Sequence, residues 1–194
     1  MITPIRALHD QVFGAVERNF GPWLPGLFAR LVFAAVLLAY FLNSAMTKIG
    51  SGALGFLTVT DSAYFQILPP VVEAHGFDVS QVPFLPWGLV VHLGTYAEIV
   101  LPVLIVVGLF TRLAALGMIG FVVVQSFVDI AFHHADDKTI GALFDRLPDS
   151  AILDQRALWM VLLVYLVVRG AGAVSLDRLL AGADRPSPRA RLRV

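Results

Sequence analysis

The sequence predicts an all-α membrane protein, built as a transmembrane four-helix bundle. Three observations lead to this prediction. Of the 194 residues, 58% are hydrophobic and only 14% are charged, whereas a soluble domain carries about 25% charged residues. Four apolar runs each approach the ~20 residues that a helix needs to cross a bilayer. The short connection at 108–112 favours antiparallel neighbours, as in a simple bundle.

The apolar runs define the four spans in chain order. The first covers residues 27–46, the second 88–109, the third 113–132 and the fourth 157–174. With the segments between them, they form a membrane domain that we expect at residues 27–180.

Residues 1–26 predict an amphipathic helix on the membrane surface. Apolar side chains recur at helical spacing at Ile5, Leu8, Val12, Val16 and Phe20. This pattern is typical of a helix in the interface of the inner leaflet, and a short helix packed under the bundle is the alternative. Acids, prolines and glycines in this stretch argue against a cleaved signal peptide, so we expect the first span to be retained.

The segment between the first and second spans, residues 47–87, is expected to fold back over the bundle. It contains glycines and prolines but stays apolar. We predict short helices or a re-entrant segment, which at membrane depth must be covered by protein or water. At the other end of the chain, residues 181–194 are basic and contain prolines. We predict a flexible tail there that is attracted to anionic lipid.

The basic side chains predict the orientation. With the N-terminus inside, ten of the 14 lysines and arginines lie on the inner side and four on the outer side, which favours two cytoplasmic termini. The net charge of zero gives no case for nucleic acid as a partner. Cysteine is absent, so any redox role must use a quinone, a metal or a partner subunit.

Glu98 is the residue that points most directly to a functional site. It lies in the middle of the second span, where an ionisable group costs about 2.5–3.5 kcal/mol. Pro102 follows four residues later. Because proline has no N–H, the carbonyl of Glu98 loses its usual helical partner.

A polar pocket is predicted in the outer half of the bundle. Gln125, Asp129 and His133 have the i, i+4, i+8 spacing of one ridge on the third span. His92 and Tyr96 form a similar pair on the second span. At a rise of 1.5 Å per residue, His92 lies about 7 Å below the outer end of its span, at nearly the same depth as Asp129.

The first interpretation of this pocket is proton chemistry on a quinone headgroup that enters from the lipid. Glu98, Asp129 and Lys48 are then the candidate catalytic groups, with Lys48 as the counter-ion. Histidine titrates near neutral pH and suits such a site. His92, Tyr96 and Gln125 are the candidate cofactor-binding residues.

Other interpretations remain open. His92, Asp129, His133 and His134 could hold a transition metal such as Zn, Fe or Cu(II), or the pocket could bind another small polar ligand. Alternatively, these groups only pair with one another, at ~0.6 kcal/mol for an average interhelical hydrogen bond. Arg156 is expected to cap the outer end of the fourth span or to pair with Asp154.

Several short segments in order resemble the DoxX family of small four-span bacterial membrane proteins. Arg30 opens the first span and Lys48 closes it. The stretch YAEIVLPVLIVVGLFTRLAA follows at 96–115, then LDQRALW at 153–159 and RGAGAVSLDRLL at 169–180. Together these segments cover about residues 27–180.

The resemblance implies a multi-pass protein of the bacterial inner membrane. Some relatives are associated with oxidoreductase assemblies, including thiosulfate:quinone oxidoreduction and oxidative-stress complexes. The pattern positions are Arg30, Lys48, Glu98, Arg112 and residues 170–177. The expected function is therefore a quinone- or metal-linked component of an oxidoreductase system, with a partner subunit or as a homo-oligomer. A non-enzymatic scaffold or a transporter-like binding protein is the alternative.

Overall fold

The computed structural model describes residues 2–183. The regular structure in these residues is helical, apart from one isolated β-bridge between Ile49 and Val59. Four of its helices are long and apolar enough to cross a membrane. They cover Leu24–Met46, Phe84–Val107, Thr111–Ala131 and Ala151–Arg169. The predicted all-α fold with four spans is confirmed.

The first span begins earlier than predicted. It consists of α2 (Leu24–Phe33), a π-helical turn (Ala34–Leu38) and α3 (Ala39–Met46). Pro25 lies in the first turn, where proline's missing N–H is not needed and its fixed φ favours the start of a helix. The helix therefore begins before the apolar run itself.

The second and third spans form a tight hairpin. A π-helical turn (Phe84–Gly88) leads into α6 (Leu89–Val107), and α7 (Thr111–Ala131) follows. Gly108 ends α6 with a φ of 72°, and the carbonyl of Leu104 accepts from the N–H groups of Gly108 and Leu109. This left-handed cap satisfies the last carbonyls of the helix and turns the chain at once.

The fourth span is shifted relative to the predicted residues 157–174. A π-helical turn (Ala151–Gln155) precedes α9 (Arg156–Arg169). Ser150 and Asp154 cap this start, because the N–H of each donates to the side chain of the other, at 2.9 and 3.1 Å. Gly170 ends the span with a φ of 75°, and residues 170–175 are not helical.

The remaining helices lie outside the spans. As predicted, short helices fill the segment between the first two spans: α4 (Asp61–Ile67), α5 (Pro69–Ala74) and the 3-10 turns Gly55–Leu57 and Val79–Gln81. The others are α1 (Ile2–Phe20), α8 (Asp137–Ile140) and α10 (Leu176–Ala183).

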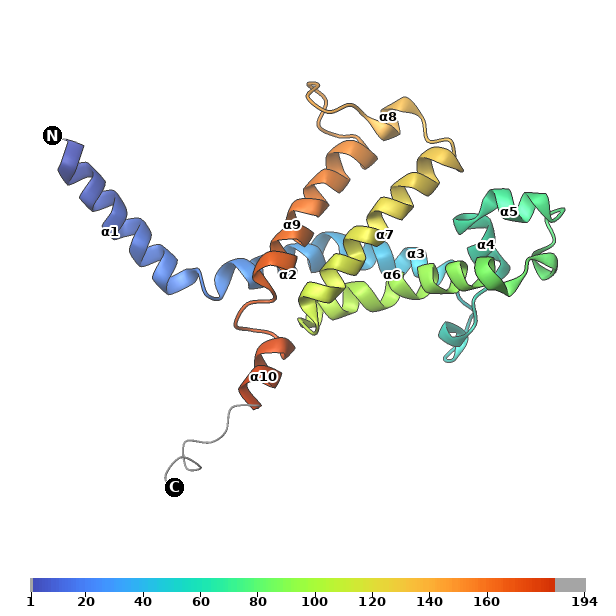
Figure 1. Ribbon diagram of the computed structural model, residues 1–194, viewed down its shortest axis with the longest axis horizontal. Coiled ribbons are helices and arrows are strands. Elements are labelled where there is room, and N and C mark those ends of the chain that lie inside the picture. Colours follow the sequence, from blue (N-terminus) through green and yellow to red (C-terminus); the bar gives the residue numbers. More distant parts are fainter. Residues whose placement is uncertain (1, 184–194) are drawn as a thin grey trace, which may run out of the picture.

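The N-terminal helix α1 extends away from the bundle (Figure 1), and its apolar side chains Ile5, Leu8 and Phe13 are exposed. Its placement in a membrane interface stays a prediction. From residue 184 onward, the predicted tail lies outside the described residues.

The spans pack as two pairs that cross. The first span lies along α6, and α7 lies along α9, while α6 also contacts α7 and α2 contacts α9 (Figure 1). Phe33, Phe41, Met118, Leu163 and Leu166 form the buried centre. We call the end of the bundle with the α6–α7 turn and α10 the terminal end, and the end with α4, α5 and α8 the loop end.

Replacement of Gly108 by alanine is expected to lower the melting temperature in detergent. The left-handed backbone alone costs a non-glycine residue about 1–2 kcal/mol. In addition, a Cβ here would lie 2.6 Å from Ser175 Cβ and 2.8 Å from Arg30 Cζ. The measurement is thermal unfolding followed by circular dichroism. Gly120→Ala is the control, because a Cβ at Gly120 meets nothing within 4 Å. Equal melting temperatures for the two variants would contradict this account.

Candidate functional site

The membrane carboxylate of Glu98 is paired with a lysine from the first span. Lys48 Nζ lies 3.0 Å from Glu98 Oε2, and both side chains are at most 7% exposed. Lys48 also donates to the carbonyl and the hydroxyl of Ser44, at 3.1 and 2.8 Å. The three N–H donors of the ammonium group are thus all used. The Ser44 hydroxyl in turn donates to Glu98 Oε1 at 3.4 Å.

The second membrane acid is paired across the other two spans. Arg156, at the start of α9, donates from Nη2 to Asp129 Oδ2 on α7, and its Nη1 donates to the Ser126 hydroxyl at 2.8 Å. Arg156 is buried. Its expected pairing with Asp154 does not occur, because Asp154 caps its own helix through Ser150. Each of the two acids therefore has a cation from a neighbouring span.

A cavity of about 430 Å³ lies between these two ion pairs. Lys48, Glu98 and Ser44 line it from one side, and Gln125 and Asp129 line it from α7. The three candidate catalytic residues, Glu98, Asp129 and Lys48, thus line one cavity between the spans. Gly117 and Gly120 also line it, and their missing side chains leave room between α6 and α7.

The polar side chains of the cavity differ in how fully they are bonded. Gln125 Nε2 donates to the Tyr40 hydroxyl at 2.9 Å, whereas Gln125 Oε1 is buried and has no partner within the described chain. At the loop end, His133 Nε2 lies 2.8 Å from the carbonyl of Gln66 on α4, and both residues line the cavity. The cavity wall thus contains an amide whose oxygen is buried without a hydrogen-bond partner in the described chain.

His92 and Tyr96 are not among the residues that line this cavity. His92 Nδ1 lies 2.7 Å from the carbonyl of Gly88 in its own helix, and its ring packs edge-on against Phe84 and Tyr64. These contacts place His92 in the packing between α6 and the short helices at the loop end. Burial and the nearby charge of Asp61 raise the pKa of the Tyr64 hydroxyl in this packing.

The proposed metal ligands are not brought together. His133 faces α4, Asp129 faces Arg156, and His134 is exposed in the turn after α7 with a φ of 52°. Within residues 2–183, no group of three or more histidine, aspartate or glutamate side chains could hold a metal ion. The geometry thus gives no support to the metal interpretation of His92, Asp129, His133 and His134.

Arg30 and residues 170–177, which carry part of the family resemblance, meet at the terminal end of the bundle. The buried guanidinium of Arg30 donates to the carbonyls of Ile105 and Val106 at 3.0 and 2.6 Å, and also to those of Ala171 and Val174. It therefore ties the first span to the end of α6 and to the connection that follows α9.

Asp177 closes the same region from α10. Its carboxylate accepts from the N–H groups of Phe110 and Thr111 at 2.6 and 2.9 Å, and its own N–H donates to the carbonyl of Gly108 at 2.8 Å. A carboxylate at the first turn of α7 also faces the positive end of the helix dipole. Arg30 and the segment 170–177 thus connect the first span, the α6–α7 turn and the chain that follows α9.

Ser44 and Gln66, which line the cavity, and Ser126 and Arg156, which bond to each other beside Asp129, were not assigned to the site from the sequence. Ser44 stands four residues before Lys48, and Ser126 three residues before Asp129. These are the spacings at which helical side chains meet. That signal could have identified both serines, but no spacing links Arg156 to Asp129 across 27 positions.

Four helical spans, two ion pairs between spans and a cavity with charged residues on its wall define a multi-pass membrane protein. The family model described as DoxX matches residues 26–133, which is more than half of the 194 residues. The chain belongs to the DoxX family, and the predicted resemblance is confirmed over these residues. The match includes Lys48, Glu98 and Asp129 but ends before Arg156. No curated protein and no solved structure matches the chain.

Proposed function

We propose that this protein is the membrane subunit of a quinone-linked oxidoreductase system, and that its cavity binds the headgroup of a lipid-soluble quinone. The observation that carries the proposal is a cavity between membrane spans with ionisable side chains on its walls and exposed apolar side chains at its edge. Glu98, Lys48 and Asp129 supply the walls. Polar groups placed this way inside membrane proteins typically mark a proton or ligand pathway.

The entrance supports a ligand that arrives from the lipid. Val90, Leu93 and Val124 line the cavity and are 41%, 63% and 57% exposed. They belong to α6 and α7, two of the membrane spans, so the bilayer covers these side chains. A quinone has a polar headgroup and an apolar tail, and it matches this combination of polar walls and lipid-facing entrance.

The chemistry that the residues can supply is proton transfer. Reduction of a quinone to a quinol takes up two electrons and two protons. Lys48 Nζ donates to Glu98 Oε2 at 3.0 Å, and both groups line the cavity, so a proton could pass from this pair to a bound headgroup. Asp129 and His133 provide further proton-binding groups on the path towards the loop end. The chain has no cysteine, so a partner subunit would supply or accept the electrons.

We further propose a bacterial inner membrane as the location, with both termini in the cytoplasm. The supporting observation is the order of basic residues and spans in the sequence, which assigns ten of the 14 lysines and arginines to the inner side when the N-terminus is inside. A scaffold with a sealed, fully paired interior is the less favoured alternative, because a cavity of about 430 Å³ lies between the spans and Gln125 Oε1 has no hydrogen-bond partner in the described chain.

Filling the cavity should weaken quinone binding. A phenylalanine at Gly120 would project from a position where a Cβ meets nothing within 4 Å and which lines the cavity. We expect the variant to bind quinone about tenfold more weakly, which corresponds to a loss of ~1.4 kcal/mol in binding free energy. The measurement is extraction and quantification of ubiquinone and menaquinone from protein purified in mild detergent, supplemented by titration.

Val123→Phe is the matched control, since Val123 lies on the same helix, is 57% exposed and does not line the cavity. The control should bind quinone like the parent. A parent protein that binds neither quinone, or a Gly120→Phe variant that binds as well as Val123→Phe, would refute the proposed function.

A further inference from the structure

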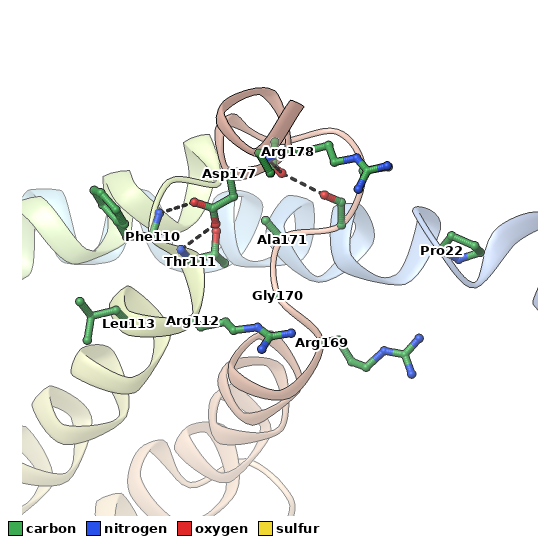
Figure 2. A pocket seen from close by; sticks show the side chains of 14 residues that line it. Pro22, Phe110, Thr111, Arg112, Leu113, Arg169, Gly170, Ala171, Asp177 and Arg178 are labelled. Carbon is green, nitrogen blue, oxygen red and sulfur yellow. Dashed lines mark hydrogen bonds between the residues drawn. The ribbon is translucent and has the colours of Figure 1, made fainter. Parts of the chain in front are cut away.

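A second hollow, of about 630 Å³, opens at the terminal end of the bundle, and it is lined by three arginines. Arg112 comes from the start of α7, Arg169 from the end of α9 and Arg178 from α10. Figure 2 shows Arg112 and Arg169 on either side of Gly170, with Arg178 across from them. All three arginines are exposed. We call this space the cationic hollow.

No acid within the described residues pairs with the arginines of the cationic hollow. Within residues 2–183, the guanidinium groups of Arg112, Arg169 and Arg178 make no ion pair and no hydrogen bond. Asp177 is the single acid in the lining, and both of its carboxylate oxygens already accept backbone N–H groups at 2.6 and 2.9 Å. Three free cations around one hollow favour an anion that accepts several hydrogen bonds.

Thr111 gives an independent indication of a ligand. It lines the hollow, is 0% exposed, and its hydroxyl has no hydrogen-bond partner within the described chain. A buried hydroxyl without a partner costs free energy. An oxygen-rich anion in the hollow could accept from this hydroxyl and from the arginines together.

A separate apolar groove of about 490 Å³ runs along α9 and shares Arg169 with the cationic hollow. Its other lining residues are Met160, Val161, Val164, Tyr165 and Val168. Val161, Val164 and Val168 are 66%, 50% and 63% exposed, on a helix that spans the membrane. The groove therefore begins at the arginine and continues into the depth of the bilayer.

We propose that these two spaces bind one anionic phospholipid, with its phosphate at the three arginines and an acyl chain in the groove on α9. Guanidinium groups bind phosphate oxygens in pairs of parallel hydrogen bonds, and basic pockets between membrane helices are known to hold lipid headgroups. A free phosphate would use the hollow alone. The apolar continuation past Arg169 is the feature that selects a lipid. This site is distinct from the cavity around Glu98, and it does not depend on the proposed function.

The lipid preference is tested on the full-length protein in mild detergent. Native mass spectrometry and thermal unfolding would compare dioleoylphosphatidylglycerol, dioleoylphosphatidylcholine and inorganic phosphate. We expect phosphatidylglycerol to bind at one molecule per chain and to raise the melting temperature. Phosphatidylcholine and inorganic phosphate should do neither at the same concentration. Equal binding of the two lipids would refute the site, and a shift with phosphate alone would make it a site for a soluble anion.

Variants separate the two parts of the site. Arg112→Gln and Arg169→Gln should each weaken phosphatidylglycerol binding by roughly fivefold, whereas Arg146→Gln, an exposed arginine at the loop end, should not. Val164→Trp fills the groove and should also weaken lipid binding. Leu158→Trp is its control, because Leu158 is 68% exposed on α9 and lies outside the groove. Unchanged affinity in Val164→Trp would refute the acyl-chain part of the proposal.

Discussion

A Lys48→Met variant should be less stable than the parent by about 3–5 kcal/mol, the usual cost of removing one partner from a buried ion pair. Lys48 and Glu98 are 4% and 5% exposed, and their charged atoms lie 3.0 Å apart. Without the ammonium group, Glu98 would keep only the Ser44 hydroxyl, at 3.4 Å. The measurement is the free energy of unfolding in mixed micelles of detergent and denaturing surfactant.

The double variant Lys48→Met/Glu98→Gln should recover most of that loss. An apolar side chain and a neutral amide replace the pair, so no uncompensated charge remains inside the bundle. The two single changes must therefore be strongly non-additive in a double-mutant cycle. Lys138→Met is the control, because Lys138 is exposed on α8 and its removal should change stability by no more than about 0.5 kcal/mol. Additive effects of the two changes would contradict the pairing.

The fold could be predicted from the sequence because the bilayer leaves few alternatives. A spanning helix must satisfy its backbone internally and be apolar over its whole length, so the four spans are visible as runs of residues. Their ends were less predictable. Pro25, the capping pair Ser150 and Asp154, and the left-handed Gly170 set the boundaries, and these local contacts lie outside the apolar pattern.

The candidate site was predicted only in part, because helix rotation decides which side chains meet. On α6, the cavity is lined by Val90, Leu93, Gly94, Ala97 and Glu98, which follow the three- and four-residue spacing of one helix face. At 3.6 residues per turn, His92 and Tyr96 lie on a different face from Gly94. Similar depth in the membrane therefore did not predict which side chains share the cavity, since His92 lies outside it. Glu98 and Asp129 do line the cavity.

The terminal end illustrates a further limit of the sequence. Arg30 and the segment 170–177 were recognised as pattern positions, but their contact joins residues that are up to 144 positions apart. No periodicity predicts a contact of that kind. The structure shows that the guanidinium group is a backbone anchor, and that explains why arginine and the turn of residues 170–175 occur together in this chain.

Even the conservative change Arg30→Lys should destabilise the terminal end. The planar guanidinium donates to four carbonyls in two segments, whereas an ammonium group presents three donors from one point. A lysine could not reach Ile105 and Val106 on α6 and also Ala171 and Val174 after α9. Each buried carbonyl left without a partner costs about 1–3 kcal/mol. We expect a lower melting temperature and faster amide exchange in residues 105–110 and 170–177.

Arg18→Lys on the exposed part of α1 is the control, and it should leave both measurements unchanged. A stable Arg30→Lys variant with normal amide exchange would contradict the anchoring role.

Arg30 also affects the cationic hollow. Gly170 and Ala171 line that hollow, and Arg30 donates to the carbonyl of Ala171 at 3.3 Å. Loosening of this segment would move Arg169 and Arg178 relative to Arg112. The Arg30→Lys variant should therefore bind phosphatidylglycerol more weakly, and the proposed quinone binding in the cavity around Glu98 should not change.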